Sequence, residues 1–250
     1  MNYIHPTAFI GKNVKLGTNN VIQQNVIIDG NIELGDNNTL GPNSVFINNI
    51  KIGSNNNFYG SISAGALGEM GTKGDVFVED GFIIIGSNNI FREFITINSP
   101  VRLKKTEIGN NCYFMARTHI PHDAKVNNFV TMATNSIIGG GCIVNDYAYL
   151  GLGSITHQWL EIGKFAMVGM QAVNNKDIPP YLTVVGVPTK INGINKIGLT
   201  RRGIDLNTIE AAENQLKNIL EPNFHTENYL INDILEFFEN KPNSLKTFLK

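Results

Sequence analysis

Large apolar residues recur at every sixth position through most of this chain. One row runs from Ile10 to Phe58 without a gap, and a second runs from Ile108 to Val168 with Thr156 as its single polar member. Self-similarity at so short a period is typical of a parallel β-helix, in which one coil cannot bury its own apolar face and neighbouring coils must stack. Three six-residue sides predict a coil of about 18 residues that rises by about 4.8 Å.

Small residues and asparagines complete the repeat. Positions two residues before each large apolar residue of the second row are mostly small, so both are expected to face a narrow interior. Asparagine tolerates left-handed backbone and hydrogen-bonds its own turn, so a periodic asparagine predicts a corner between two faces. Such asparagines stand three residues after each of the first eight apolar positions: Asn13, Asn19, Asn25, Asn31, Asn37, Asn43, Asn49 and Asn55.

The period is interrupted twice, which predicts loop insertions near residues 59–84 and 98–107. The first is rich in Gly and Ala from Ser61 to Gly74, and loops on a rigid scaffold often carry binding residues. The second holds Arg102, Lys104 and Lys105, which are expected either to form a solvated loop or to meet an acidic carrier or phosphates.

The repeats fade after Val168, and prolines punctuate the connector that follows. From about Asn207 the apolar spacing becomes helical. One face has Ile209, Ala212, Leu216 and Ile219 or Leu220, and a second helix uses Leu230, Ile234, Leu235 and Phe238. We therefore expect a β-helix over residues 1–190 and a helical domain over 191–250. A short third helical segment is expected from Ser244.

Composition narrows the range of partners. The chain has 20 Lys and Arg against 21 Asp and Glu and no basic block, which argues against nucleic acid as a main partner. Cys112 and Cys142 occupy small inward positions, so we expect buried free thiols in a reducing cytoplasm. We expect no membrane span and no export signal, because no apolar run reaches about 18 residues and Met1–Phe9 lacks a signal pattern.

Candidate chemistry gathers in the run from His119 to Asp123. Ile120 faces the interior, so His119 beside it is expected to face outward, with His122 and Asp123 at a corner. A histidine beside a carboxylate suits proton transfer near neutral pH. His157 is expected about two coils further on, near the same edge. Two alternatives stay open: the imidazoles only decorate a surface, or outward histidines of different subunits bind zinc as in a carbonic-anhydrase-like enzyme.

Four ordered motifs resemble the acyl-carrier-protein:UDP-N-acetylglucosamine O-acyltransferases of lipid A biosynthesis. These are Thr118–Asp123, Thr156–Trp159, Asp177–Tyr181 and Gly198–Gly203. The resemblance implies a left-handed parallel β-helix, a homotrimer and active sites in clefts between subunits.

The same resemblance implies roles for individual residues. His122 would be the general base, Asp123 its orienting partner, and the backbone N–H of Gly140 a donor to the oxyanion. The residues expected near the substrate are His119, His157, Gln158, Asn195, Arg201 and Arg202. The thioester of an acyl carrier protein or coenzyme A activates the acyl group, so no bound metal or prosthetic group is expected.

Three positions depart from the family pattern. No clear match to its Q-D-x-K-[YF] segment exists between Gly65 and Asp75, where Lys73 is the nearest substitute. Gly141 stands where the family commonly has a histidine, and a glycine suits a corner of the repeat. Met170 matches a position along the acyl pocket, where a bulky side chain predicts a short or medium acyl chain.

The leading hypothesis is O-acylation of UDP-N-acetylglucosamine from an acyl carrier protein. N-acylation of a UDP- or dTDP-linked amino sugar from acyl-CoA, for surface polysaccharide synthesis, is the alternative, because an amine needs less activation than a hydroxyl. A zinc lyase or hydratase and a purely structural β-helix are the remaining alternatives.

Overall fold

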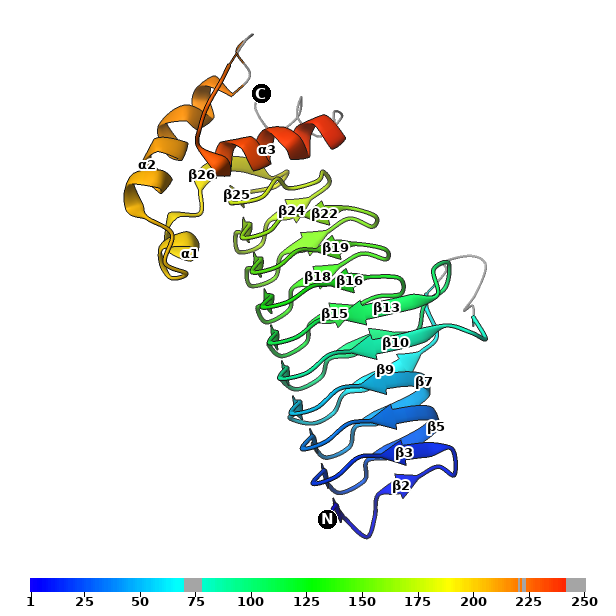
Figure 1. Ribbon diagram of the computed structural model, residues 1–250. Coiled ribbons are helices and arrows are strands. Elements are labelled where there is room, and N and C mark those ends of the chain that lie inside the picture. The colour runs from blue at the N-terminus through cyan, green and yellow to red at the C-terminus, as the bar shows by residue number, and fades with distance from the viewer. Residues whose placement is uncertain (70–77, 220, 222–223, 242–250) are drawn as a thin grey trace.

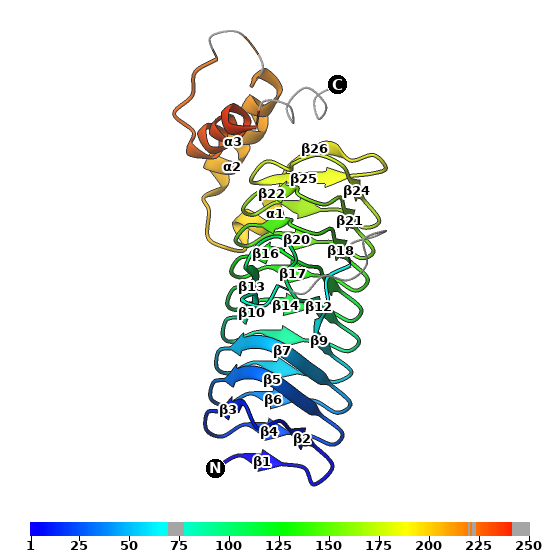
Figure 2. The ribbon, with the colours of Figure 1, turned by 90° about the vertical axis from the view of Figure 1, so that its right-hand side faces the viewer.

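The computed structural model describes residues 1–69, 78–219, 221 and 224–241, and shows a tall column of stacked coils with helices at one end (Figure 1). The predicted left-handed parallel β-helix with a helical C-terminal part is confirmed. Turned by 90°, the view shows the strands of successive coils stacked in rows along the column (Figure 2).

One face is an 11-stranded sheet with a strand from nearly every coil. Its strands pair in parallel, except that β25 and β26 are antiparallel. In spatial order the strands are β1 (Tyr3–Ile4), β4 (Val21–Ile22), β6 (Thr39–Leu40), β8 (Asn57–Phe58), β11 (Ile90–Phe91), β14 (Tyr113–Phe114), β17 (Thr131–Met132), β20 (Tyr149–Leu150), β23 (Met167–Val168), β25 (Leu182–Val185) and β26 (Lys190–Ile194).

The other two faces belong to a 15-stranded sheet that is continuous in the lower coils and divided above. The long strands β5 (Ile27–Leu34) and β7 (Val45–Ile52) span both faces, and β2 (Phe9–Ile10) and β3 (Val14–Leu16) pair with β5. Above β7 the sheet continues as two columns. The first column holds β9 (Ser63–Ala66), β12 (Thr96–Asn98), β15 (His119–Ile120), β18 (Ile137–Ile138), β21 (Ile155–Thr156) and β24 (Val173–Asn174), and the second holds β10 (Phe82–Ile85), β13 (Lys105–Ile108), β16 (Lys125–Val126), β19 (Ile143–Val144) and β22 (Glu161–Ile162).

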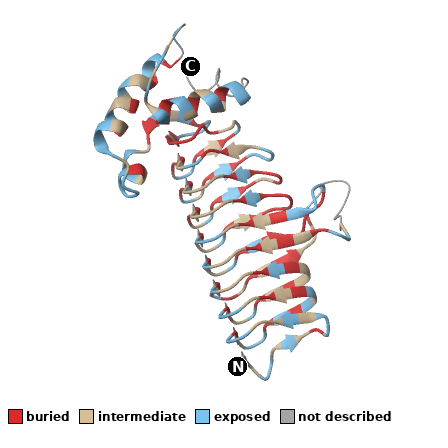
Figure 3. Ribbon diagram, viewed as in Figure 1, coloured by how far each residue is buried: buried red, intermediate tan, exposed pale blue. Residues whose placement is uncertain are grey.

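The predicted inward positions form the core. Buried residues line the interior along the whole column (Figure 3). Phe58, Phe91 and Phe114 stack along the axis with ring centroids 4.5 and 4.9 Å apart. Cys112 and Cys142 are free and buried, as expected. Burial raises the pKa of the Cys112 thiol to about 12, which keeps it protonated at neutral pH.

Asparagines also stabilise the lower coils from inside. Asn20, Asn38, Asn56 and Asn89 are buried, and each side-chain oxygen accepts the backbone N–H of the equivalent residue in the next coil. A buried amide needs such partners to offset its loss of hydration. The asparagine ladder thus ties successive coils together at one corner.

The predicted asparagine corners are confirmed in part. Positive φ values occur at Asn19, Asn25, Asn37, Asn43 and Asn55. Asn13, Asn31 and Asn49 also lie where the chain passes from one face to the next, but they are not among the residues with positive φ. Asn13 stands in the turn between β2 and β3, and Asn31 and Asn49 lie inside the long strands β5 and β7, where the neighbouring Gly30 and Asn48 take the positive φ values.

Both predicted insertions leave the column near one corner. Ile90 pairs with Asn57, 33 residues earlier, and with Tyr113, 23 residues later, whereas uninterrupted coils pair at 18. The extra residues lie between β9 and β10 and between β12 and β13. These are the places where the chain crosses from the first column to the second.

Within the described residues, three α-helices cover the end of the column. They are α1 (Lys196–Thr200), α2 (Leu206–Gln215), which continues as the 3₁₀ helix η2 (Leu216–Asn218), and α3 (Tyr229–Asn240). Asn195, Asp205 and Asn228 cap their N-termini with side-chain oxygens. The predicted buried faces of α2 and α3 are confirmed in the main, although Leu235 is only partly buried while Ile231 is fully buried.

The helices form a second hydrophobic cluster with the last strands. Tyr181 donates a hydrogen bond to the Asp233 carboxylate, which also pairs with Lys164 at 2.8 Å, so α3 is held to the column. Among the described residues, no helix is both long and apolar enough to cross a membrane. The segment expected to be helical from Ser244 lies outside the described residues.

Candidate active site

His122 and Asp123 lie at the corner between the two columns of the divided sheet. Strand β15 ends at Ile120 and β16 begins at Lys125, so four residues make the bend. Asp123 takes the left-handed conformation there, with φ of +63°. Both side chains are largely buried, at 9% and 3% residue exposure. The sequence prediction that the pair occupies a corner is confirmed.

The Asp123 carboxylate is held by backbone groups of the second insertion. It accepts hydrogen bonds from the N–H groups of Val101, Arg102 and Leu103 at 2.8–3.1 Å. Its Oδ2 lies 2.8 Å from His122 Nδ1. Because the carboxylate accepts at Nδ1, that nitrogen carries the proton and Nε2 is left as the acceptor. Sequence reasoning missed this support, because backbone donors leave no signature in side-chain identity.

The imidazole of His122 is packed against two glycines. A β-carbon built on Gly140 would lie 2.6 Å from His122 Nε2, and one on Gly68 would lie 2.8 Å from His122 Cβ. Both distances are shorter than van der Waals contact, so the ring fits only because these positions lack side chains. Gly140 belongs to the next coil, and Gly68 to the first insertion, which therefore contributes to the wall of the site.

The backbone N–H of Gly140 is available beside this ring. Its neighbours are engaged, since Gly139 N–H donates to Thr156 and Gly141 N–H donates to His122. Within the described ranges, the Gly140 N–H has no acceptor. A basic imidazole nitrogen and an unused donor therefore lie side by side at one corner.

Gly141 and Trp159 explain the absence of a histidine at position 141. Gly141 has φ of +69°, and a β-carbon there would lie 2.2 Å from Trp159 Cε3. The indole of the next coil therefore covers the position. The expectation that this glycine serves a corner is confirmed.

His119 faces outward from β15, as predicted. Its Nδ1 lies 2.7 Å from the hydroxyl of Thr96, the paired residue on β12. Burial lowers the pKa of His119, and nearby His122 lowers it further, while Glu69 acts in the opposite direction. His119 is therefore neutral near pH 7.

His157 and Gln158 lie at the same corner two coils further along the column, as the 18-residue length of a coil predicts. Gln158 is 36 residues after His122, two coils of 18, with Gly140 between them. His157 Nδ1 contacts the Gln158 carbonyl at 3.2 Å. The three glycines from Gly139 to Gly141 thus lie between His122 in the preceding coil and His157 in the following coil.

Other expected site residues lie elsewhere on the same chain. Met170 is at the corner between the 11-stranded sheet and the first column, and is 69% exposed. Asn195 caps α1 and donates to the Phe165 carbonyl, so its amide is already engaged. Lys73 lies outside the described residues.

The two arginines belong to the helical end. Arg201 lines a pocket of about 760 Å³ over the outer side of the 11-stranded sheet, with Tyr149 and Ile197 among its walls. The Arg202 guanidinium lies over the ring of Tyr147, 4.8 Å from its centroid. One chain therefore does not bring these cations to the corner that holds His122.

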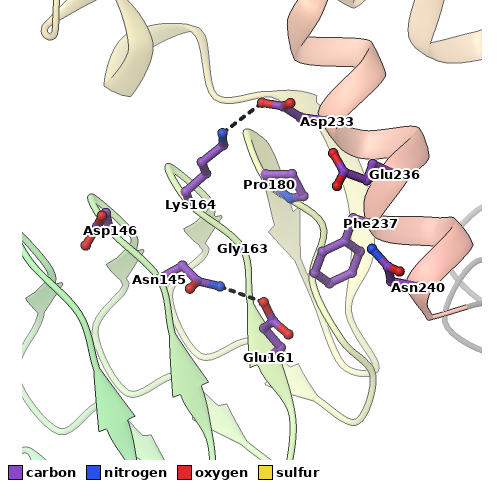
Figure 4. A pocket seen from close by; sticks show the side chains of 10 residues that line it. All are labelled: Asn145, Asp146, Glu161, Gly163, Lys164, Pro180, Asp233, Glu236, Phe237 and Asn240. Carbon is purple, nitrogen blue, oxygen red and sulfur yellow. Dashed lines mark hydrogen bonds and ion pairs between the residues drawn. The ribbon is translucent and has the colours of Figure 1, made fainter. Parts of the chain in front are cut away.

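A separate cleft of about 310 Å³ lies between α3 and the coils (Figure 4). Lys164 reaches Asp233 across it, and Asn145 donates to Glu161 on its floor. Its described walls include no histidine, cysteine or serine, so it offers no proton-transfer chemistry of the kind seen at His122. In the described part of the chain, no three His, Cys, Asp or Glu side chains are grouped to hold a metal ion.

Comparison with known proteins gives one consistent result. Residues 177–248 match a family model described as "Udp N-acetylglucosamine O-acyltransferase; Domain 2". A UDP-N-acetylglucosamine acyltransferase structure from Bacteroides fragilis 9343 superposes with a TM-score of 0.88 at 30% identity, covering 95% of this chain and 97% of that one. The Francisella novicida UDP-N-acetylglucosamine acyltransferase superposes with a TM-score of 0.72 at 26% identity, covering 98% and 96%.

A curated relative is similar in sequence over a shorter stretch. The acyl-[acyl-carrier-protein]–UDP-N-acetylglucosamine O-acyltransferase of Stenotrophomonas maltophilia (strain R551-3) is 37% identical over 141 residues, which are 55% of this chain and 53% of the relative. The chain therefore spans about half the length of the curated relatives it matches.

Proposed function

Because this chain belongs to the UDP-N-acetylglucosamine O-acyltransferase family, we propose that it transfers an acyl group from a thioester donor to the sugar hydroxyl of UDP-N-acetylglucosamine. The donor in this proposal is an acyl carrier protein, as in the names of the curated relatives. Such a reaction belongs to lipid A assembly in the cytoplasm. The two buried free thiols fit that reducing compartment.

The observation that carries the proposal is the arrangement of His122 between Asp123 and Gly140. Asp123 holds Nδ1, so Nε2 accepts the proton of the sugar hydroxyl as its oxygen attacks the thioester carbonyl. The carbonyl oxygen becomes negatively charged, and the Gly140 N–H donates to it. Collapse of the tetrahedral intermediate expels the thiolate, which takes the proton from His122. The products are the acylated sugar and the free thiol.

We further propose that the working unit is a homotrimer with its sites between subunits. His122, Met170 and Arg201 lie on different sides of one chain, so a single site that uses all three must draw them from more than one copy. The first column also presents outward isoleucines, Ile27, Ile137 and Ile155, each 39–46% exposed. Burial of such a column against another copy would stabilise an assembly.

The nucleotide would then occupy the pocket beside Arg201, in this proposal. A cation beside the exposed ring of Tyr149 suits a phosphate next to a base. His119, His157 and Gln158 would contact the sugar from the corner that carries His122. Lys73 and Arg202 stay expected substrate contacts, and Asn195 would support the pocket through α1.

The acyl chain is proposed to be short or medium in length. Met170 projects from its corner with 69% of its surface exposed, so it would fill space in a cleft formed with another copy. A bulky thioether there would shorten the room for a hydrocarbon chain.

N-acylation of a nucleotide-linked amino sugar from acyl-CoA is the second candidate. It is favoured by Gly141. The family commonly has a histidine at this position, and here the Trp159 indole occupies the space that its side chain would need, so the site has one polar side chain fewer. An amine is a stronger nucleophile than a hydroxyl and needs fewer catalytic groups.

An assay with matched donors and acceptors tests the proposal. UDP-N-acetylglucosamine and UDP- or dTDP-linked amino sugars would each be combined with acyl carrier protein thioesters and acyl-CoA of several chain lengths. We expect the fastest turnover with UDP-N-acetylglucosamine and a short or medium acyl carrier thioester. Faster turnover of an amino sugar with acyl-CoA would select the second candidate, and no thioester-dependent turnover would overturn both.

A further inference from the structure

Four aromatic residues stack along the corner between the second column and the 11-stranded sheet in the upper coils. We call this the aromatic ladder, and its members are Phe129, Tyr147, Phe165 and Tyr181. Successive ring centroids are 4.7, 4.6 and 5.9 Å apart, and the ring planes differ by 5°, 13° and 24°. The rings therefore form one continuous stack that follows the edge of the column.

At this corner the aromatic residues replace asparagine. In the lower coils the same corner is occupied by Asn37, Asn55, Asn88 and Asn111, which have φ of 57–62°. The four ladder residues keep this left-handed conformation, with φ of 57–65°. Bulky side chains rarely adopt it, because their β-carbon crowds the backbone, whereas asparagine tolerates it. The turn itself therefore does not explain the exchange, and the rings must serve contacts that asparagine cannot make.

The upper half of the aromatic ladder holds the start of the helical end. Helix α1 lies beside the upper coils (Figure 1), and Asn195 is its N-cap. The Asn195 side-chain amide donates to the Phe165 carbonyl at 2.8 Å, and its backbone N–H donates to the Tyr181 carbonyl at 2.7 Å. Tyr181 also donates to Asp233 on α3. The N-terminal end of α1 is therefore fixed to the ladder.

The lower half of the ladder contacts Arg202, just beyond the other end of α1. The Arg202 guanidinium lies over the Tyr147 ring, 4.8 Å from its centroid, and 5.7 Å from the centroid of Phe129. In the described part of the chain, this guanidinium has no carboxylate within 4.0 Å and no hydrogen-bond acceptor. A cation–π contact holds a charge without using up its N–H donors. Arg202 is thus held in place while its donors stay available for an anion.

The ladder borders the pocket of about 760 Å³ that Arg201 lines. Tyr147 lies two residues before Tyr149, which is one wall of that pocket, and Arg201 directly precedes Arg202. Among the described walls, Glu213 is the one carboxylate, and it already accepts the backbone N–H of residue 194 at 2.8 Å. The pocket therefore has one guanidinium in its wall and a second at its border. Two neighbouring guanidinium groups suit a ligand with a diphosphate.

From this arrangement we propose that Tyr147 and Phe129 are positioning residues for nucleotide binding, because they hold the Arg202 guanidinium where its N–H donors meet the diphosphate of the nucleotide sugar. The inference rests on the proposed function for the identity of the ligand. The two rings act through Arg202 and do not touch the substrate. The rest of the ladder fixes α1, so that both arginines keep their place relative to the pocket.

Binding of UDP and of uridine separates the contribution of the diphosphate from that of the nucleoside. Isothermal titration calorimetry on the full-length protein, without an acyl donor, gives both affinities. For the wild type we expect UDP to bind at least about tenfold more tightly than uridine, because the phosphates add charge-assisted hydrogen bonds. In Tyr147→Asn, which restores the residue type of the lower coils, we expect the UDP affinity to fall about fivefold while the uridine affinity is unchanged.

A double-mutant cycle shows whether Tyr147 acts through Arg202. Arg202→Met is expected to weaken UDP binding, and Tyr147→Asn/Arg202→Met is expected to bind UDP no more weakly than Arg202→Met alone, because the ring then has no guanidinium to position. Tyr147→Phe keeps the ring and is expected to bind UDP within about twofold of the wild type. Additive losses in the double variant would show that Tyr147 supports only the fold, and would overturn the inference.

Tyr59→Asn is the matched control. The Arg92 guanidinium lies over the Tyr59 ring at the same 4.8 Å from its centroid, but this pair belongs to a lower coil and does not line the pocket beside Arg201. The control is expected to keep the wild-type preference for UDP over uridine. Thermal unfolding followed by circular dichroism checks that each variant is folded.

Failure of the inference is distinguishable from failure of the proposed function. Equal affinities of the wild type for UDP and uridine, or an unchanged preference in Tyr147→Asn, would overturn the inference even if acyl transfer occurs. A preference for UDP that depends on both Tyr147 and Arg202, without any acyl transfer, would leave the inference standing and remove the proposed reaction.

Discussion

The imidazole of His122 occupies the space that a side chain on Gly140 would need. A β-carbon on Gly140 would lie 2.5 Å from Cε1 and 2.6 Å from Nε2 of that ring. The two residues are 18 positions apart and stand one above the other on successive coils. The repeat therefore places a base and a backbone donor together, and the neighbouring Gly141 N–H, which donates to the His122 carbonyl, ties the two coils at this corner.

Gly140→Ala is expected to inactivate the enzyme while the fold persists. The added methyl group would push the His122 ring away from Asp123 and from the Gly140 N–H, and loss of such alignment costs about 10²–10³ in rate. Initial-rate measurements with a thioester donor check the activity, and thermal unfolding checks the fold. Full activity in the folded variant would show that the ring does not act from this position.

Asp123→Asn tests the carboxylate with little change to the backbone. Asparagine tolerates the left-handed conformation at this corner, so φ of +63° is not the reason for any loss. The neutral amide has one acceptor oxygen for the N–H groups of residues 101–103, and no longer stabilises protonated His122. We expect the free energy of unfolding to fall by about 1–3 kcal/mol and the rate by about 10²–10⁴.

Denaturant unfolding and kcat would be measured on the same preparation of Asp123→Asn. A variant with unchanged stability would contradict the role of the carboxylate in holding the second insertion. A variant with an unchanged rate would contradict its role in orienting His122.

His119 is expected to make the protein less stable in mild acid. Its pKa is lowered from 6.5 in the fold, chiefly by burial, so the unfolded chain binds a proton more readily. The stability from neutral His119 is therefore complete above pH 6.5 and is lost as the pH falls toward the folded-state pKa. Between pH 7 and 5, His119→Asn should lose unfolding free energy less steeply than the wild type. Equal slopes in urea unfolding would argue against this.

Met170→Gly is expected to extend the range of acyl chains. Removal of the exposed thioether would leave room for additional methylene groups, while stability should change by less than about 1 kcal/mol because the side chain is not packed in the core. The measurement is kcat/KM for a series of acyl donors of increasing length. An unchanged chain-length profile would remove Met170 from the acyl pocket.

Much of the fold could be predicted from the sequence because the repeat determines both packing and position. Inward residues such as Ile120 and Phe114 are set by the six-residue period, and from them the corner at His122 and its repetition at Gln158 follow. The left-handed backbone expected at the asparagine corners does not occur at Asn31 and Asn49, because they lie inside strands that span two faces. Local residue preference was overridden there by continuous strand pairing across the corner.

The parts of the site that could not be predicted depend on backbone groups and on the helical end. Three N–H groups of residues 101–103 hold Asp123, and nothing in their side chains indicates it. The basic residues in that insertion suggested only a charged surface. Asn195 and Arg202 stay predictions as substrate contacts; Asn195 caps α1 and lines the pocket beside Arg201, and Arg202 lies over the ring of Tyr147.

The central claim is that Nε2 of His122 removes the proton of the acceptor. It is tested most directly by the initial rate of acyl transfer to UDP-N-acetylglucosamine with the wild type and His122→Ala, at equal concentrations of folded protein. General-base catalysis predicts that the variant is slower by about 10²–10⁴. Turnover by His122→Ala at the wild-type rate would contradict the account.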